Sequence, residues 1–228
     1  MKEYSGLNRR AEIMKCRFAM VAASLAVTMA LSSTIVTSAR AGDIITEWGS
    51  VKGPTAPALK PVTLDPKTTA LLLLDFVPHD PYCGPGKPRC GATLPAVKQL
   101  LANARAHGAA VIYSVAGKYE AADIAKDVAP AANDLTVKSK ADKFLNTDLE
   151  KILKEKGIQT VVVTGNSANA AVLYTGTGAA LRGLKVVIPV DGLSANEPFE
   201  EQLTVWQLAH GPGFGNLVTI TKSDMIKF

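Results

Sequence analysis

One acidic residue, Asp75, follows a run of apolar residues and is the first candidate for chemistry. The run Thr69-Ala-Leu-Leu-Leu-Leu has the composition of a strand that is buried on both faces of a sheet. Burial would raise the pKa of an aspartate at the end of such a strand unless a cation keeps it charged. Lys138 is the candidate for that cation, and the two residues could together govern a proton. The alternative is that Asp75 caps a turn and Lys138 is an ordinary surface lysine.

A second candidate is the turn between a later apolar run, residues 159–164, and a segment with helical spacing. Such a turn directs backbone N–H groups and the positive end of a helix dipole toward a ligand, which suits an anion or an oxyanion. No histidine lies near Thr164 or Ser167 in the sequence to act as a base, and this disfavours a Ser-His-Asp hydrolase. The residues expected to contact substrate here are Gly165, Asn166, Ser167, Ala168, Asn169 and Ala170.

Two further side chains are candidates because of their positions. Asp191 ends another apolar run, and His79 is the one histidine that lies near a candidate acid. We therefore place His79 at the edge of the substrate site. Metal ligation by His79 with Asp75 or Asp80 is an alternative that we disfavour, and the sequence predicts neither a metal site nor a cofactor.

The candidates lie on a chain in which apolar runs alternate with segments of helical spacing. Strands separated by helices imply a mostly parallel sheet in a three-layer α/β sandwich. In such sheets ligands bind beyond the carboxyl ends of the strands, where Asp75 and the turn at 165–171 lie. Strands are expected at residues 69–75, 109–115, 159–164, 184–190 and 216–221, and helices at 94–107, 169–182 and 197–209, with another from a cap at Asn146 or Thr147 to Gly157.

The beginning of the chain resembles a secretory signal peptide. Basic residues precede an uncharged run from Phe18 to Ser38, and the run ends in the small-x-small site Ala39-Arg40-Ala41. We expect residues 1–41 to be removed and the protein to be exported, either periplasmic or secreted, without a stable membrane anchor. A retained anchor is the alternative, because the run is about as long as a bilayer-spanning helix. Met14 is an alternative start.

Two cysteines, Cys83 and Cys90, remain after cleavage, and in an exported protein their pairing is the expectation. The residues between them are rich in turn formers, so a small closed loop is sterically feasible, whereas a zinc site would need more ligands. Residues 42–67 contain four prolines and suit an extended arm, and residues 68–228 form the expected domain.

Charge and composition exclude other classes of protein. With 47% hydrophobic residues, the chain of 228 can bury a full core. The formal charge is +5, but residues 1–41 contain six basic and two acidic residues, which leaves 19 basic and 18 acidic residues in the rest. A nearly neutral body disfavours a nucleic-acid partner.

Several segments together resemble the isochorismatase-like (cysteine hydrolase) superfamily over about residues 69–191. They are Leu71-Leu-Leu-Leu-Asp75, Lys138 six residues before Phe144, Thr147-Asp-Leu149, Leu153-x-x-x-Gly157-Ile, Val161-Val-Val-Thr-Gly165, Thr175, and Gly183-x-x-Val-x-x-Pro-Val-Asp191. The resemblance implies a Rossmann-like domain, often a homo-oligomer, whose typical members use an Asp, a Lys and a Cys to hydrolyse amides or related small molecules. On this pattern Asp75 matches the acid and Lys138 the lysine.

The expected cysteine is absent. Where the family usually has a thiol, this chain has Ala171, and Val77 stands where a Gln is customary. A methyl group cannot act as a nucleophile, so thiolate attack from position 171 is excluded. Isochorismatases proper are similar in having a small residue at that position, and they cleave a vinyl ether with an acid and water.

Two functions remain open from the sequence. The first is an exported small-molecule hydrolase that uses Asp75 as proton donor and Lys138 as its partner and as ligand for a substrate carboxylate. The alternative is a catalytically silent family member that binds a small molecule or acts as an interaction surface.

Overall fold

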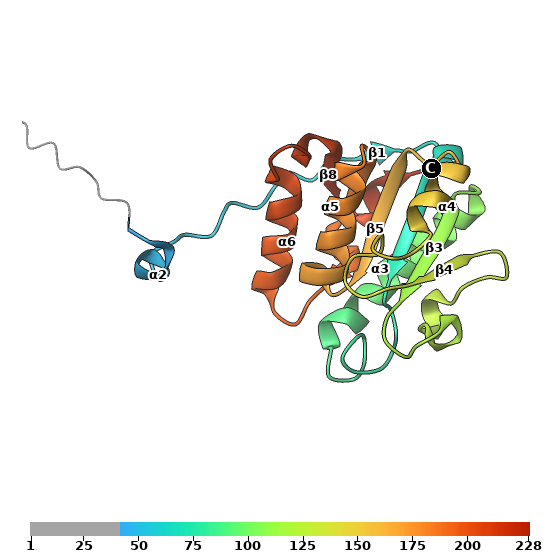
Figure 1. Cartoon of the computed structure of the whole chain (residues 1–228), viewed down its shortest axis with the longest axis horizontal. Helices are drawn as coiled ribbons and strands as arrows, with labels where there is room; N and C mark the ends of the chain where they lie inside the picture. Colours follow the sequence, from blue (N-terminus) through green and yellow to red (C-terminus); the bar gives the residue numbers. More distant parts are fainter. Residues whose placement is uncertain (1–41) are drawn as a thin grey trace, which may run out of the picture. The chain divides into compact units, whose positions relative to one another are not determined.

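A computed structural model of the protein describes residues 42–228 (Figure 1). The predicted leader and its cleavage site lie outside these residues. The chain divides into two compact units, and the boundary lies between Gly53 and Pro54. None of the helices in residues 42–228 combines the length and apolar character needed to cross a bilayer.

The described part of the first unit contains one helical turn, α2 (Ile44–Glu47). Asp43 caps this turn, because its carboxylate accepts hydrogen bonds from the N–H groups of Ile45 (2.9 Å) and Thr46 (3.0 Å). The arm expected at residues 42–67 is therefore not extended throughout.

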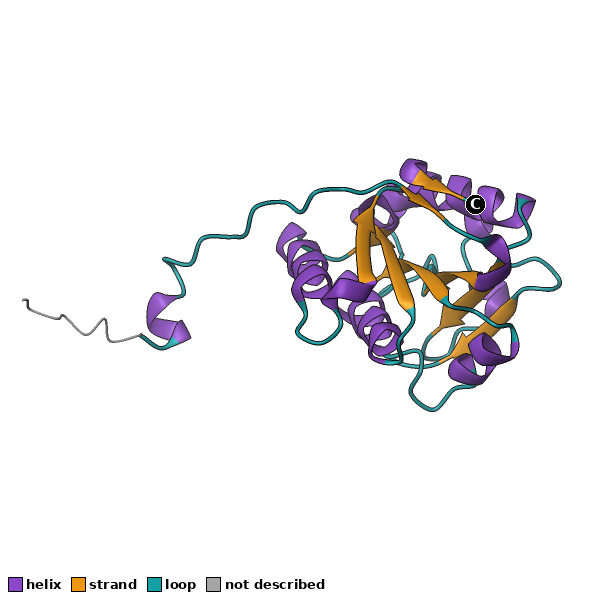
Figure 2. Cartoon of the chain, turned by 90° about the horizontal axis from the view of Figure 1, so that it is seen from above, coloured by secondary structure: helices purple, strands orange, loops and turns teal. Residues whose placement is uncertain are grey.

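The second unit is built on a seven-stranded sheet in which every pairing is parallel (Figure 2). The strands are, in spatial order, β4 (Leu135–Lys138), β3 (Ala110–Val115), β2 (Thr69–Leu74), β5 (Thr160–Asn166), β6 (Lys185–Pro189) and β8 (Val218–Thr221), and β7 (Leu193–Ser194) pairs with the end of β5. A separate parallel pair joins β1 (Val62–Thr63) to β9 (Ile226–Lys227). All residues of β2 and β5 are buried, which explains their nearly continuous apolar sequences.

Helices cover both faces of the sheet (Figure 2) and complete three layers. The helices are α3 (Pro88–Ala106), α4 (Leu149–Glu155), α5 (Leu173–Leu181) and α6 (Pro198–His210). Leu72 and Leu74 of β2 pack in a core with residues of α4, α5 and α6, whereas Leu71 and Leu73 pack in a second core with residues of α3. The alternation of side chains along β2 thus supplies both cores, and the predicted α/β sandwich with a mostly parallel sheet is confirmed.

Two elements differ from the predictions. Helix α3 begins at Pro88, six residues before the expected start, because Pro88 occupies the first helical position, where its missing N–H costs nothing. The sequence interval around Lys138 is not merely a polar connection, because it contains the edge strand β4. The N-cap of α4 is Asp148, one residue after the last of the expected caps, Asn146 and Thr147. The Asp148 side chain forms no cap hydrogen bond, and the Leu149 N–H donates instead to the Thr147 hydroxyl (3.2 Å).

Candidate active site

The site begins where β2 ends, at the centre of the sheet. Strands β3 and β4, which follow β2 in the chain, lie on one side of β2, whereas β5, β6 and β8 lie on its other side. The strand order therefore reverses between β2 and β5, which makes this position a topological switch point. Asp75 leaves β2 here with a positive φ of 57°, and its N–H donates to the Ser114 carbonyl (3.1 Å). Aspartate tolerates this left-handed conformation better than most residues, and strained positions of this kind cluster at functional sites.

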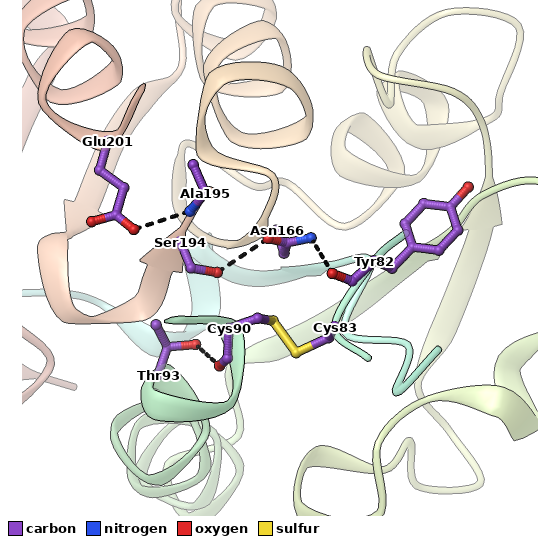
Figure 3. Close-up of a disulfide and its surroundings, with 8 residues drawn as sticks. All are labelled: Tyr82, Cys83, Cys90, Thr93, Asn166, Ser194, Ala195 and Glu201. Carbon is purple, nitrogen blue, oxygen red and sulfur yellow. Dashed lines mark hydrogen bonds between the residues drawn. A yellow bond between two sulfur atoms is a disulfide. The ribbon is translucent and has the colours of Figure 1, made fainter. Parts of the chain in front are cut away.

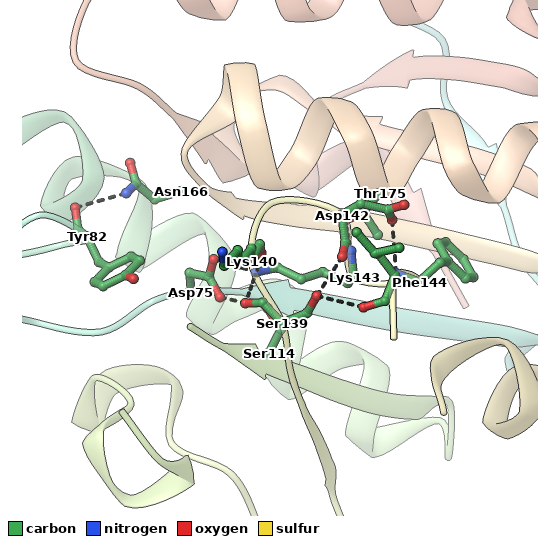
Figure 4. Close-up of polar contacts among 11 residues, drawn as sticks. Asp75, Tyr82, Ser114, Ser139, Lys140, Asp142, Lys143, Phe144, Asn166 and Thr175 are labelled. Carbon is green, nitrogen blue, oxygen red and sulfur yellow. Dashed lines mark hydrogen bonds and ion pairs between the residues drawn. The ribbon is translucent and has the colours of Figure 1, made fainter. Parts of the chain in front are cut away.

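The carboxylate of Asp75 is buried and is held at both oxygens (Figure 4). Lys143 Nζ lies 2.7 Å from Oδ2, and Ser114 Oγ donates to Oδ1 at 2.9 Å. The side chain of Lys143 is fully buried, and that of Asp75 is 5% exposed. Desolvation by burial raises the pKa of Asp75 above its ordinary value, although the charge and hydrogen bond of Lys143 and the hydrogen bond of Ser114 oppose the rise.

Lys143 is positioned by a loop that several hydrogen bonds hold in place (Figure 4). Its backbone N–H donates to Thr175 Oγ1 of α5 (3.2 Å), and the next N–H, of Phe144, donates to Asp142 Oδ1 (2.9 Å). Its ammonium also donates to the carbonyl oxygens of Lys140 (2.5 Å) and Ser139 (3.4 Å). The three N–H bonds of the ammonium thus have three acceptors within the protein.

The assignment of Lys138 as the partner of Asp75 is wrong in this structure. Lys138 is the last residue of β4, and it follows the buried Val137. Because side chains alternate along a strand, Lys138 points away from the core, is 44% exposed and forms an ion pair with Glu120. Lys143, five residues later, takes the buried position.

A cavity of about 410 Å³ lies beside Asp75 at the carboxyl ends of β2 and β5. Of the expected site residues, the structure brings five to this cavity, namely Asp75, Asn166, Ser167, Ala170 and Ala171. Its other lining residues were not predicted from the sequence, and they are Pro81, Tyr82, Ala116, Gly117, Lys140 and Ala141. A larger cavity, about 740 Å³, lies at the opposite ends of the strands, among the first residues of β5 and β6.

The turn after β5 uses its polar groups within itself. The N–H groups of Ala170 and Val172 both donate to the Ser167 carbonyl at 3.2 Å, so these two N–H groups are not free to hold an oxyanion. Ser167 Oγ donates to Asn169 Oδ1, and Asn169 Nδ2 donates to Glu200 Oε1 at 2.9 Å. The hydroxyl of Ser167 therefore faces an amide oxygen rather than a base.

Several expected site residues do not line the cavity. Gly165 and Ala168 are buried, and Asn169 is engaged with Ser167 and Glu200. His79 is exposed and stacks on Tyr119, with 5.5 Å between the ring centroids. Asp191 accepts hydrogen bonds from the N–H (2.9 Å) and Oγ (2.7 Å) of Ser223, so its carboxylate holds a turn of the chain.

A disulfide begins at the residue that follows Tyr82, one of the residues that line the cavity (Figure 3). Cys83 and Cys90 are bonded, with their Cα atoms 5.3 Å apart. The bridge joins the loop that carries Tyr82 to the first turn of α3, and Asn166 Nδ2 donates to the Tyr82 carbonyl from β5 (2.9 Å). Closing a loop of this length contributes about 2–3 kcal/mol to stability in the chain-entropy account.

Gly165 allows β5 to approach β2 closely beside Asp75, and a side chain at this position should therefore destabilise the fold. Its φ is +151°, and a Cβ atom there would lie 2.5 Å from the Leu74 carbonyl oxygen. We expect Gly165→Ala to lower the free energy of unfolding by at least about 2 kcal/mol. Chemical denaturation would measure this loss.

Gly183 is the matched control, because its φ is +84° and the position of its Cβ is open. Gly183→Ala should cost about 1 kcal/mol, from backbone strain alone. Equal losses in the two variants would show that contact with Leu74 does not restrict position 165.

Comparison with known proteins assigns the family. The isochorismatase domain model matches residues 69–222, which is more than half of the chain. The uncharacterized isochorismatase family protein YaaI of Bacillus subtilis (strain 168) is 29% identical over 84 residues, or 36% of this chain and 46% of that protein. The alignment thus spans less than half of that relative.

Solved structures share the fold. N-carbamoylsarcosine amidase from Thermoplasma acidophilum superposes with a TM-score of 0.59 at 21% identity, covering 69% of this chain and 97% of the other. A cysteine hydrolase from Pseudomonas syringae pv. phaseolicola 1448A gives a TM-score of 0.62 at 21% identity, with coverages of 75% and 95%. The chain belongs to the isochorismatase family, and this membership supports a hydrolase.

Proposed function

We propose that this protein is an exported small-molecule hydrolase in which Asp75 donates a proton and water is the nucleophile. The observation that carries the proposal is the buried pair of Asp75 and Lys143 beside a cavity that Ala171 lines, the position at which the sequence resemblance implies the family thiol. Asp75 is the catalytic residue because it lines the cavity. Lys143 is a positioning residue because its ammonium is occupied by protein acceptors.

The thiols and hydroxyls of the described residues offer no activated nucleophile at the cavity, and this favours attack by water. Both cysteines of this part of the chain are in the disulfide. Two hydroxyl residues line the cavity, Ser167 and Tyr82. Ser167 Oγ donates to an amide oxygen, which cannot remove its proton, and burial raises the pKa of the Tyr82 phenol, which disfavours its nucleophilic phenolate form.

An acid without a nucleophile suits substrates that become electrophilic on protonation, such as vinyl ethers. Asp75 in its protonated form would give its proton to the enol carbon, whose π electrons form the new C–H bond and leave an oxocarbenium ion. Water adds to the oxygen-bearing carbon of this ion, which is the neighbour of the protonated carbon, and returns one proton to the Asp75 carboxylate. The resulting hemiketal then breaks its C–O bond to give a carbonyl compound and an alcohol. A raised pKa serves this cycle, because Asp75 then holds its proton closer to neutral pH.

Export is supported by the leader-like pattern of residues 1–41 and by the pairing of Cys83 with Cys90. Disulfides persist in oxidising compartments and are rare in the cytosol.

A non-catalytic binding protein is the second candidate. The occupation of both Asp75 oxygens by Ser114 and Lys143 favours it, because a substrate would have to share or displace one of these contacts. Both functions use the same cavity, so turnover has to separate them.

The test is a panel of small vinyl ethers and amides incubated with the protein beginning at Gly42. The amides are included because the fold is shared with an amidase. We expect hydrolysis of a vinyl ether, insensitivity to thiol reagents, and no covalent adduct on the protein in rapidly quenched samples analysed by mass spectrometry. Incubation in D₂O should place one deuterium on the former enol carbon. Binding of panel compounds without turnover would favour the silent alternative, and a covalent adduct would contradict water as the nucleophile.

A further inference from the structure

The charged side chains at the cavity differ in whether they have partners within the protein. Asp75 is neutralised by Lys143, and the three donors of Lys143 are directed at Asp75, Lys140 and Ser139. Lys143 therefore has no N–H left for a ligand. The role of binding a substrate carboxylate, expected of the family lysine, must fall to another group if the ligand is an anion.

Lys140 is a charged residue that lines the cavity and has its ammonium free of described partners. Its side chain forms no hydrogen bond or ion pair with any of residues 42–228, whereas Lys138, two residues earlier, is paired with Glu120. Its backbone is fixed, because the Lys140 carbonyl accepts a hydrogen bond from the buried ammonium of Lys143 (2.5 Å). The same contact that holds Lys143 on Asp75 thus also holds the base of the Lys140 side chain at the cavity.

The rest of the lining is suited to an uncharged body. Small apolar side chains, among them Ala116, Ala170 and Ala171, face the cavity with Pro81 and Tyr82. Its volume of about 410 Å³ is in the range of sites for small molecules. Because the donors of Lys143 are all directed at protein acceptors, Lys140 is the lysine of the lining that can offer its ammonium to a ligand.

We propose that Lys140 is the specificity-determining residue of the cavity, which selects small ligands with a carboxylate at one end and an apolar body at the other. The carboxylate binds the ammonium of Lys140, and the apolar body lies against the alanines. This inference rests on the proposed function for its meaning in catalysis, but the binding step does not require turnover.

The experiment compares binding of benzoate and its neutral counterpart benzamide by ligand-observed NMR titration. We expect the wild-type protein to bind benzoate about fivefold more tightly than benzamide, as one close charge contact in water supports. Lys140→Met should abolish this preference, and Lys140→Glu should reverse it. The preference should also weaken at high salt, because the ammonium is exposed.

Lys138→Met is the matched control, because it removes an exposed lysine from the same segment but away from the cavity, and it should keep the wild-type preference. An unchanged preference in Lys140→Met, or wild-type protein that does not discriminate benzoate from benzamide, would overturn the assignment. Turnover of the panel compounds separates this inference from the proposed function. A benzoate preference that depends on Lys140, in a wild-type protein that turns over no panel compound, would remove the hydrolase and leave Lys140 as the binding determinant.

Discussion

Lys143→Met is expected to lower the free energy of unfolding by about 3–5 kcal/mol, the usual cost of removing one partner from a buried ion pair. Methionine fills a similar volume but leaves the Asp75 carboxylate in a desolvated position with Ser114 as its remaining side-chain partner. The pKa of Asp75 should then rise further, because the two effects of Lys143 that lower it are lost. Urea denaturation followed by circular dichroism would measure the change.

The pH dependence of this loss has a definite sign. In the unfolded chain Asp75 titrates near its ordinary pKa, while in the folded variant it retains its proton to higher pH. The folded state then binds more protons than the unfolded state between the two pKa values, so stability falls as pH rises through that window. We therefore expect Lys143→Met to be closer to wild type near pH 4 than at pH 7.

Two companion variants test the cause of that loss. Lys138→Met removes an exposed, solvent-screened pair with Glu120, and its effect should stay within about 0.5 kcal/mol. Asp75→Leu combined with Lys143→Met removes both charges and should recover much of the stability that the single variant loses. A Lys143→Met protein as stable as wild type at pH 7 would show that the ion pair does not hold this part of the fold.

The central strands could be predicted because strands that are buried on both faces consist mostly of apolar residues. Strands β2 and β5 are covered on both faces, so their runs of Leu and Val have no polar alternation to confuse with a surface strand. Strand β4 was not predictable in the same way. It lies at the edge of the sheet and buries one of its four residues, Val137, so its sequence resembles a polar connection.

The acidic residue of the site could be predicted from the sequence, but the lysine that pairs with it could not. Asp75 is a charged residue directly after a run of four leucines in a strand that is buried throughout, and its burial follows from that position. Three lysines occur within six residues, at positions 138, 140 and 143, and spacing to Phe144 singled out the wrong one. One observation that favours Lys143 was available in the sequence, namely its placement beside the apolar Phe144. The alternation that turns the Lys138 side chain away from the core could be used only once β4 was known to be a strand. The hydrogen bond that the Lys143 N–H donates to Thr175 Oγ1 joins residues far apart in the chain, so it depends on tertiary structure and left no signal in the sequence.

Asp75→Asn is expected to lower kcat by about 10²–10⁴-fold on the panel compound that the wild-type protein hydrolyses, which is the usual contribution of a general acid. Asparagine keeps the size of the side chain and an oxygen for Ser114 or Lys143, but it has no proton to give. KM should change little, because the cavity keeps its shape. Asp191→Asn is the matched control, since Asp191 binds Ser223 outside the cavity lining, and its kcat should equal that of wild type.

Ser114→Ala then decides whether Asp75 acts as an acid or as a base. The hydrogen bond from Ser114 lowers the pKa of Asp75, so its removal should raise that pKa. If the protonated carboxyl is the active form, activity falls at high pH, and the falling limb of the pH profile should move upward in Ser114→Ala. If the carboxylate is the active form, a rising limb should move upward instead, and activity at neutral pH should drop. The first result supports proton donation by Asp75, and the second would make Asp75 a base that activates water. The two results can be told apart because the mechanisms share the same ion pair and differ in whether the protonated or the ionised form of Asp75 is active.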